Sequence, residues 1–290
     1  MKKTLFTGCG VALVTPFKNG KVDFAAFDRH LDRLLNAGVD AYFPCGTTGE
    51  PATLTDEEWK AVIEFTVKKV SGRAPVIAGT GSNNTAHVIE RAKIAADLGA
   101  DAQLCVTPYY NKTTQAGAIA HFSAIADQST LPVVVYNVPV RTGMDLTAST
   151  YAELAKHPNI IAVKDAGANV TKSIQAITVC NDEVTFYSGE DAIVAPLLAV
   201  GYKGVVSVTA NIVPEMVVKM SHSPAEEAGV WQKKLCRLNE LLFCETSPIP
   251  AKAALSMMGI FEDELRLPLI PMSDANRALL RAELQNLGVL

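Results

Sequence analysis

Short apolar runs rich in β-branched residues alternate with longer amphipathic segments along the 290-residue chain. Such runs, bounded by turn residues, are typical of buried strands, whereas apolar positions at helical spacing predict helices. Several predicted helices are followed by glycine, as at Gly38 and Gly99, which is a helix stop signal. The predicted strands are Gly10–Thr15, Ala41–Pro44, Val76–Ala78, Gln103–Thr107, Val133–Tyr136, Ile160–Lys164, Val184–Ser188 and Gly204–Ser207. The predicted helices between them are Phe24–Ala37, Asp56–Val70, Thr85–Leu98, Gln115–Gln128, Thr147–His157, Val170–Cys180 and Ala192–Val200.

The regular alternation predicts an α/β fold, a (β/α)8 TIM barrel. Most strand ends lie about 25–35 residues apart, which is the span of one strand–helix unit. A doubly wound open sheet is the rival, but it usually has a glycine-rich phosphate turn after its first strand, and Thr15–Gly20 has none. We expect the catalytic barrel to occupy residues 1–224 and a three-helix appendage to occupy residues 225–290. The predicted appendage helices are Ala225–Phe243, Pro250–Met258 and Asp274–Leu287.

Composition and charge exclude several classes of protein. The net charge is −4 and no block of Lys and Arg stands out, so we expect no nucleic-acid partner. No run reaches the roughly 18 apolar residues that a membrane span needs, so we expect a cytoplasmic protein without membrane contact. The six cysteines form no C-x-x-C pair and are interpreted as reduced core residues, and the five histidines show no metal-ligand spacing.

A barrel carries its active site at the carboxyl ends of its strands. Lys164 stands at such an end, directly after the apolar run 160–163. Only a neutral amine attacks a carbonyl, and burial disfavours the ammonium form, so this position suits Schiff-base chemistry. The alternative is structural: Lys164 would pair with Asp165 at an ordinary strand end.

Other polar residues at strand ends have both a functional and a structural interpretation. Tyr110 and Tyr136 could form a proton relay through the hydroxyl of Thr47, or could simply fill the upper layer of the barrel. Arg141 could bind a substrate carboxylate, or could be a solvated loop charge. The turn 46–49, Gly-Thr-Thr-Gly, lacks the Gly-Lys-Ser/Thr ending of a nucleotide loop, so we expect it to hold a carboxylate instead.

Taken in order, these motifs and those of the tail resemble the dihydrodipicolinate synthase family, which belongs to the class I pyruvate-dependent aldolases. The resemblance runs from about residue 5 to the end of the chain. The motifs are Gly46-Thr-Thr-Gly-Glu50, Thr107-Pro-Tyr-Tyr-Asn111, Tyr136-Asn-Val-Pro-Val-Arg-Thr-Gly143, Val163-Lys-Asp-Ala166, Ser188-Gly-Glu-Asp-Ala192, Gly204-Val-Val-Ser-Val-Thr-Ala-Asn211, Ser247-Pro-Ile-Pro250 and Arg266-Leu-Pro-Leu269.

The resemblance implies an enzyme of lysine (diaminopimelate) biosynthesis that needs no cofactor. Lys164 would form an imine with pyruvate, and the resulting enamine would attack the aldehyde of aspartate semialdehyde before ring closure releases the lysine. Tyr136 would be the acid/base over the Schiff base. Thr47 would connect it to Tyr110, which in this family reaches into the neighbouring subunit's site.

The resemblance also implies the substrate contacts and the assembly. Thr48 would hold the pyruvate carboxylate, and Arg141 would bind the carboxylate of the second substrate. Gly189 and Val206 would contribute backbone groups near the lysine. The expected assembly is a homotetramer, a dimer of dimers.

The chain departs from the family pattern at two places. Ser247 stands where Asn is frequent, a change expected to be peripheral. At the regulatory lysine site, Asn83 and Tyr109 match, whereas the region around Ala52 and His87 is degenerate. Pro51, Asp56, Trp59 and His87 stand where Ser, His, His and Glu would be expected. We therefore expect weak or absent inhibition by lysine.

Two other functions stay open from the sequence. The same barrel could carry a 2-keto-3-deoxy sugar-acid aldolase or an N-acetylneuraminate lyase, but those sites need hydroxyl-pairing groups where Arg141 stands. An inactive barrel acting as a binding protein is the third possibility, although no member of the predicted relay is missing.

Overall fold

The computed structural model describes residues 2 and 4–290; residues 1 and 3 of the predicted unit 1–224 lie outside the described residues. Eight strands form one sheet in the order β4-β1-β10-β9-β8-β7-β6-β5, and neighbouring strands run parallel. The strands of this sheet are β1 (Gly8–Ala12), β4 (Ala41–Phe43), β5 (Ile77–Gly79), β6 (Ala102–Val106), β7 (Val133–Asn137), β8 (Ile160–Asp165), β9 (Thr185–Ser188) and β10 (Gly204–Ser207).

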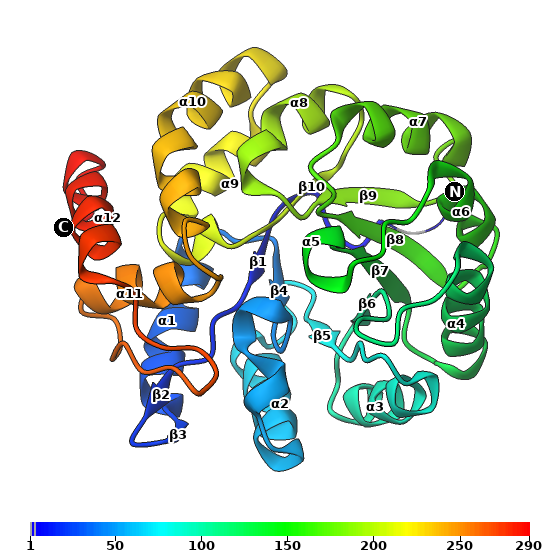
Figure 1. Cartoon of the computed structure of the whole chain (residues 1–290), viewed down its shortest axis with the longest axis horizontal. Coiled ribbons are helices and arrows are strands. Elements are labelled where there is room, and N and C mark those ends of the chain that lie inside the picture. The colour runs from blue at the N-terminus through cyan, green and yellow to red at the C-terminus, as the bar shows by residue number, and fades with distance from the viewer. Residues whose placement is uncertain (1, 3) are drawn as a thin grey trace.

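The two outer strands of this order meet, so the sheet closes into a barrel. A parallel bridge joins Tyr42 of β4 to Val76, the residue before β5. Figure 1 looks along the barrel and shows the strands inside a ring of helices. Nearly every strand residue is buried, as expected for parallel strands covered on both faces. The predicted (β/α)8 fold is confirmed.

Six helices of the ring begin at side chains that cap their free N–H groups. Thr55 and Glu58 form a capping box at the start of α2, and Asp23, Asn84, Thr114, Thr147 and Asn169 cap their helices in a similar way. The ring helices are α1 (Phe24–Asn36), α2 (Asp56–Val70), α3 (Thr85–Asp97), α4 (Gln115–Gln128), α6 (Ala148–Ala155), α7 (Val170–Cys180), α8 (Val194–Ala199) and α9 (Pro214–His222).

The predicted boundaries mostly hold within two residues, with a few exceptions. The first strand begins at Gly8 and ends at Ala12, earlier than predicted. Helix α9 and the four-residue α5 (Pro139–Thr142) were not among the predicted ranges. The short hairpin of β2 (Phe17–Lys18) and β3 (Lys21–Val22) was also missed, because two-residue strands show no periodicity.

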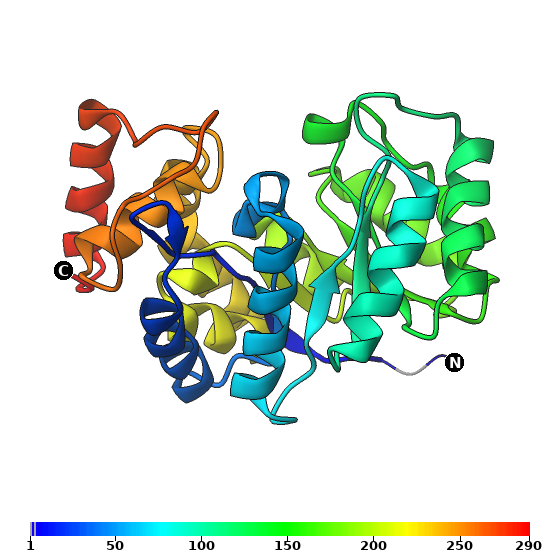
Figure 2. The same cartoon turned by 90° about the horizontal axis from the view of Figure 1, so that it is seen from below.

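Three helices follow the ring, as predicted: α10 (Ala225–Leu242), α11 (Ile249–Met257) and α12 (Asp274–Asn286). Figures 1 and 2 place α12 at the outer edge of the molecule, beside α11. Helix α10 packs on α8 and α9, and its Leu235 and Leu238 belong to the same hydrophobic core as barrel residues. A domain boundary at residue 225 therefore stays a prediction.

The cysteines correct one expectation. Cys9, Cys45, Cys105 and Cys180 are buried, but Cys236 and Cys244 are exposed and so are not core residues. Cys236 lies on the exposed side of α10, and Cys244 lies just after the end of that helix. The apolar pattern of the sequence did not separate these exposed positions from the buried side of the helix.

No helix among the described residues is long and apolar enough to cross a membrane.

Candidate functional site

Two strand-end side chains point into the barrel from neighbouring strands. Tyr136 of β7 and Lys164 of β8 are partners in the parallel register. The Lys164 Nζ lies 4.2 Å from the centre of the Tyr136 ring, and only 5% of Lys164 is exposed. A buried amine on an apolar strand is the environment that favours imine chemistry. The structure thus brings Lys164 and Tyr136 together, and their catalytic roles stay a prediction.

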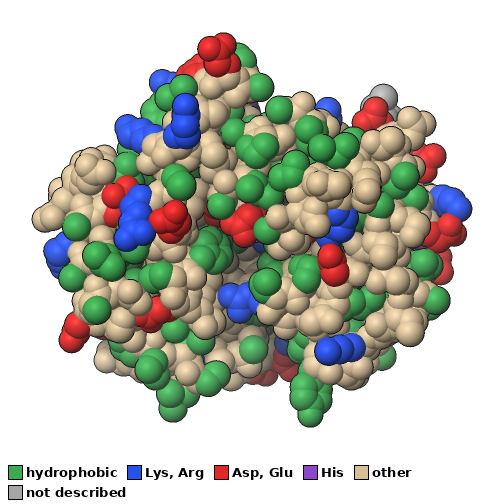
Figure 3. Space-filling model, turned by 45° about the horizontal axis from the view of Figure 1, so that its top comes forward, with side chains coloured by type: hydrophobic (Ala, Val, Ile, Leu, Met, Phe, Trp, Pro, Cys, Tyr) green, Lys and Arg blue, Asp and Glu red, His purple; other side chains and the backbone are tan. Residues whose placement is uncertain are grey.

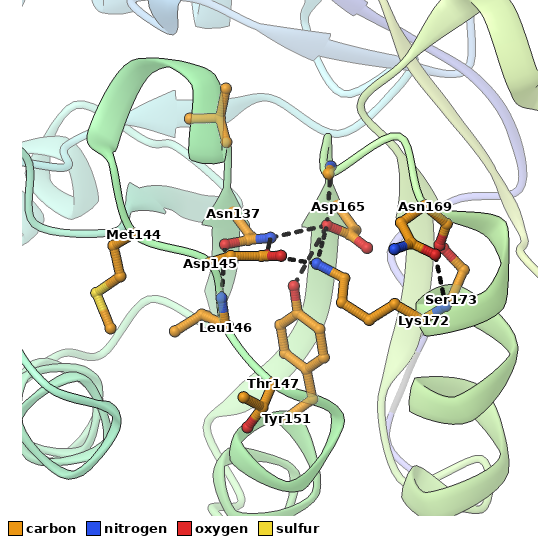
Figure 4. Close-up of polar contacts among 12 residues, drawn as sticks. Asn137, Met144, Asp145, Leu146, Thr147, Tyr151, Asp165, Asn169, Lys172 and Ser173 are labelled. Atoms are coloured by element: carbon orange, nitrogen blue, oxygen red, sulfur yellow. Dashed lines mark hydrogen bonds and ion pairs between the residues drawn. The ribbon is translucent and has the colours of Figure 1, made fainter.

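The next residue on each strand points to the other side of the barrel wall, because side chains alternate along a strand. Asp165 Oδ1 accepts hydrogen bonds from Asn137 Nδ2 at 2.9 Å and from the Tyr151 hydroxyl at 3.3 Å. Lys172 of α7 lies 3.6 Å from the same oxygen and 2.5 Å from Asp145 (Figure 4). Asp165 thus has its own partners, and the structural alternative of a Lys164–Asp165 pair is wrong.

A cavity of about 700 Å³ opens in front of Lys164. Its wall includes six of the residues predicted to be catalytic or substrate-binding. The face drawn in Figure 3 is hollowed near its middle, with basic and acidic side chains at the edge of the hollow. The six predicted residues in the cavity wall are Thr47, Thr48, Tyr136, Arg141, Lys164 and Gly189.

The turn after β4 brings two hydroxyls to this cavity. It forms a short 3-10 helix over Thr47–Gly49, in which the Gly49 N–H donates to the Gly46 carbonyl at 2.9 Å. Thr15 Oγ1 donates to the Gly49 carbonyl at 2.8 Å and so ties the turn to the segment after β1. Thr48 is buried, and its neighbour Thr47 is half-buried. This compact turn can offer hydroxyl and N–H donors to a carboxylate.

Gly189, after β9, has no room for a side chain. A Cβ at this position would stand 2.8 Å from the Ala166 Cβ and 3.1 Å from the Lys164 Cε. The absence of a side chain therefore leaves space for the lysine stem at the cavity wall.

Arg141 contacts the tail of the chain. Its Nη2 donates to the Ser247 carbonyl at 2.8 Å, and Ser247 lines the cavity together with Thr246. The segment before α11 thus reaches the cavity, but the contact uses the backbone carbonyl of Ser247, so the expectation that the change of side chain is peripheral stays a prediction. The sequence offered no signal for this contact between residues 106 positions apart.

Two predicted residues do not reach the cavity within one chain. Tyr110 is 93% exposed and has a left-handed backbone with a φ of 65°. Val206 is buried within β10, in register with Gly10 of β1, and is not part of the cavity wall. The exposed Tyr110 is not among the residues that line the cavity with Thr47 and Tyr136. The relay therefore stays a prediction.

A second cavity of about 520 Å³ adjoins the first and shares Thr47, Tyr136 and Arg141 with it. Three of the predicted regulatory positions, Ala52, His87 and Tyr109, line this second cavity, as does Arg91. Asn83 lies beside this cavity; its carbonyl accepts from Asn111 Nδ2 at 3.0 Å.

The carboxylates after β9 were not predicted as site residues. Glu190 lines the main cavity, and burial raises its pKa, although a hydrogen bond from the Ala192 N–H opposes the rise. Asp191 is buried and accepts hydrogen bonds from Ser207 Oγ at 2.5 Å and from the Val208 N–H at 2.8 Å. Burial likewise raises the pKa of Asp191, against these hydrogen bonds and the nearby Lys164. Their position after a strand end was the available signal.

Fold and site together define a (β/α)8-barrel lyase of the class I aldolase type, with a buried lysine at the carboxyl ends of the strands. The sequence matches the Dihydrodipicolinate synthetase family over residues 5–287. The chain belongs to this family, and the family resemblance found in its motifs is confirmed.

The relatives match over the whole chain. The 4-hydroxy-tetrahydrodipicolinate synthase of Acetivibrio thermocellus is 46% identical over 294 residues, which cover 100% of both chains. The enzyme of the same name from Geotalea uraniireducens is 45% identical over 99% of this chain and 100% of its own. The crystal structure of the chloride-inhibited dihydrodipicolinate synthase from Acinetobacter baumannii in complex with pyruvate has a TM-score of 0.97 at 41% identity, covering 99% of this chain and 100% of that one.

Proposed function

We propose that the chain condenses pyruvate with L-aspartate 4-semialdehyde to 4-hydroxy-tetrahydrodipicolinate, in the biosynthesis of lysine, with Lys164 as the reacting amine. The amine adds to the pyruvate ketone, and loss of water gives an imine. Loss of a proton from the pyruvate methyl group gives an enamine, whose carbon attacks the aldehyde. The amino group of the second substrate then displaces Lys164 from the imine carbon and closes the ring.

The other residues of the cavity supply proton transfer and carboxylate binding in this proposal. Tyr136, whose ring lies beside the Lys164 amine, moves protons during imine formation and enamine attack. Thr48 holds the pyruvate carboxylate through its hydroxyl and N–H. Arg141 binds the carboxylate of the second substrate, because its guanidinium can form two parallel hydrogen bonds. Gly189 contributes a backbone group near the lysine.

The observation that carries this proposal is the buried amine of Lys164 in a cavity that also contains Tyr136, Thr48 and Arg141. A guanidinium in the wall of the same cavity suits a substrate with a second carboxylate better than a sugar acid.

The test is reductive trapping. Borohydride with pyruvate should add the mass of a reduced pyruvate imine to the peptide that contains Lys164, and Lys164→Ala should abolish both the adduct and turnover. Lys156→Ala serves as a control for an exposed amine outside the cavity. Turnover with aspartate semialdehyde, but not with sugar-derived 2-keto acids, supports the proposed substrate; the reverse preference would indicate a sugar-acid aldolase.

We also propose that the protein works as a homotetramer, a dimer of dimers, in the cytoplasm. The exposed Tyr110 supports the assembly, because the relay needs this phenol beside a cavity that it does not reach in its own chain. The four buried, unpaired thiols are compatible with a reducing compartment.

Inhibition by lysine should be weak or absent. The second cavity, of about 520 Å³, is lined by His87, where the family pattern has Glu, and by Arg91. A lysine α-ammonium would lose a charge-assisted hydrogen bond worth roughly 1.5–3 kcal/mol. Steady-state kinetics with added lysine checks this, and an inhibition constant in the low micromolar range would contradict it.

A further inference from the structure

A buried ion pair connects the C-terminal helix α11 to the turn that carries Thr47 and Thr48. Lys252 Nζ lies 2.6 Å from Glu50 Oε1. The Lys252 side chain is 0% exposed and that of Glu50 is 2% exposed, although 202 residues separate them in the sequence. Lys252 Nζ also lies 4.1 Å from the centre of the Phe17 ring.

Glu50 lies between two short 3-10 helices, Thr47–Gly49 and Pro51–Thr53. Its backbone is left-handed, with a φ of 53°, which is unfavourable for a residue with a side chain. Its N–H donates to the Thr47 carbonyl at 3.2 Å, and its own carbonyl accepts from the Thr53 N–H at 3.2 Å. The conformation of the Thr47–Thr53 segment therefore depends on Glu50 keeping this backbone geometry.

Within the described part of the chain, Lys252 is the cation in direct contact with the Glu50 carboxylate, and Arg266 acts on it from further away. Among the described residues, Glu50 Oε2 has no hydrogen-bond partner. A charge left unpaired in the interior is strongly unfavourable, so the chain would move to bring it to water. Loss of either partner should therefore shift the turn rather than merely weaken it.

A second contact supports the same segment from the tail. Arg266 Nη1 donates to the Thr53 carbonyl at 2.8 Å, and its guanidinium lies 4.2 Å from the centre of the Phe17 ring. Phe17 is thus flanked by both cations, Lys252 and Arg266. The C-terminal segment supports the turn at its middle and at its end.

We propose that Lys252 and Glu50 are positioning residues for the substrate carboxylate: the pair holds the turn so that Thr48 and Thr47 face the amine of Lys164. This inference rests on the proposed function, in which Thr48 binds pyruvate. In this proposal the C-terminal helices contribute to substrate binding. They act through the Thr47–Thr53 segment, which is far from α11 in the sequence.

The experiment measures the pyruvate concentration that gives half of the maximal borohydride-trapped adduct on Lys164. In Lys252→Met and in Glu50→Gln this concentration should rise about 10-fold or more, since a lost hydrogen bond to a charged group costs at least that factor in affinity. The maximal amount of adduct at saturating pyruvate should change less. Should Lys252→Met fail to fold, Glu50→Gln, which keeps the side-chain shape, gives the answer.

Leu255→Ala is the matched control, because Leu255 is a fully buried residue of the same helix α11. It should lower the melting temperature through a cavity while leaving the half-saturating pyruvate concentration within about 2-fold. Folded Lys252→Met and Glu50→Gln with unchanged half-saturation would overturn the proposal, as would an equal rise in Leu255→Ala. Absence of any adduct in the unaltered chain would instead overturn the proposed function.

Discussion

Lys164 and Asp165 are neighbours in the sequence and serve opposite sides of the barrel wall. Lys164 faces the cavity beside Tyr136, whereas Asp165 faces outward and accepts hydrogen bonds from Asn137 and Tyr151. The alternation of a strand thus separates the reacting amine from the residues that hold its strand end.

Tyr136→Phe tests the acid/base role of the phenol. Removing the hydroxyl should lower kcat by roughly 10²–10⁴-fold, the usual range for general acid–base catalysis, while the ring keeps its place beside Lys164. Tyr42→Phe is the control, because the buried Tyr42 hydroxyl has no hydrogen-bond partner within residues 2 and 4–290. Steady-state turnover of both variants decides the matter, and full activity of Tyr136→Phe would show that the role is misassigned.

Residue type and position predicted much of the candidate site. Lys164 and Arg141 could be proposed from the strand ends at which they stand, because a barrel gathers those ends at one face. Ser247 and Lys252 could not be placed in the same way. Their importance comes from contacts with Arg141 and Glu50, which lie more than 100 residues away in the chain.

At the scale of elements, the segment between β7 and α6 is held at both of its ends. Asn137 Oδ1 accepts from the Leu146 N–H at 3.1 Å, and Asn137 Nδ2 donates to Asp145 at 2.8 Å. Lys172 of α7 adds an ion pair to Asp145 (Figure 4). These contacts fix the short helix α5, which carries Arg141 to the cavity.

Lys172→Met should destabilise the protein by about 3 kcal/mol, because it leaves the buried Asp165 carboxylate without its cation. The Lys172 and Asp165 side chains are 12% and 2% exposed, so solvent replaces little of the lost interaction. Urea unfolding at neutral pH measures the change. Lys156→Met, which removes a pair whose lysine is 67% exposed, should cause no measurable change; equal losses in the two variants would contradict the prediction.

Elements with several turns or several buried residues were predicted from the sequence, and short ones were not. The 15-residue α2 has a capping box and acidic residues in its first turn, so its signals agree. The four-residue α5 and the hairpin β2–β3 have too few residues for any periodicity. Tertiary contacts hold them, as the Thr107–Thr142 hydroxyl bond at 3.2 Å does for α5.

At the scale of the whole molecule, His30 of α1 joins elements from both ends of the barrel sequence. Its Nε2 lies 3.2 Å from Asn211 Oδ1, and Asn211 Nδ2 donates to the Ala12 carbonyl at 2.8 Å. Nδ1 of His30 has no hydrogen-bond partner among the described residues. A proton on this ring would therefore be buried without compensation.

Stability should fall in mild acid because of this histidine and His121. Burial lowers the pKa of each to about 4, below the ordinary value of about 6.5. A lowered folded-state pKa means that stability is complete above pH 6.5 and is lost as the pH falls toward 4, by about 3 kcal/mol per histidine. Urea unfolding between pH 7 and pH 4.5 should show a smaller loss in His30→Gln than in the unaltered chain; an identical loss would exclude His30 as a cause.

The proposed assembly predicts complementation between two inactive variants. Tyr110→Phe lacks the phenol that the neighbouring subunit needs, and Lys164→Ala lacks the reacting amine. In mixed dimers one site regains both groups, so co-refolded variants should recover activity at about a quarter of their sites. Each variant refolded alone is the control. Recovery no greater than the sum of the two separate variants would contradict a shared site.

Periodicity, turn residues and strand ends were sufficient to predict the parallel barrel, most of its helices and a lysine at its mouth, because those signals are local. Closure of the sheet by the Tyr42–Val76 bridge, the return of the tail over Arg141 and the pairing of Lys252 with Glu50 were decided by the packed chain. Such contacts join segments that are far apart in the chain. The hydrophobic pattern of each segment alone is compatible with many ways of packing the segments together. Burial selects one of them, since a charged group in the interior needs its particular partner.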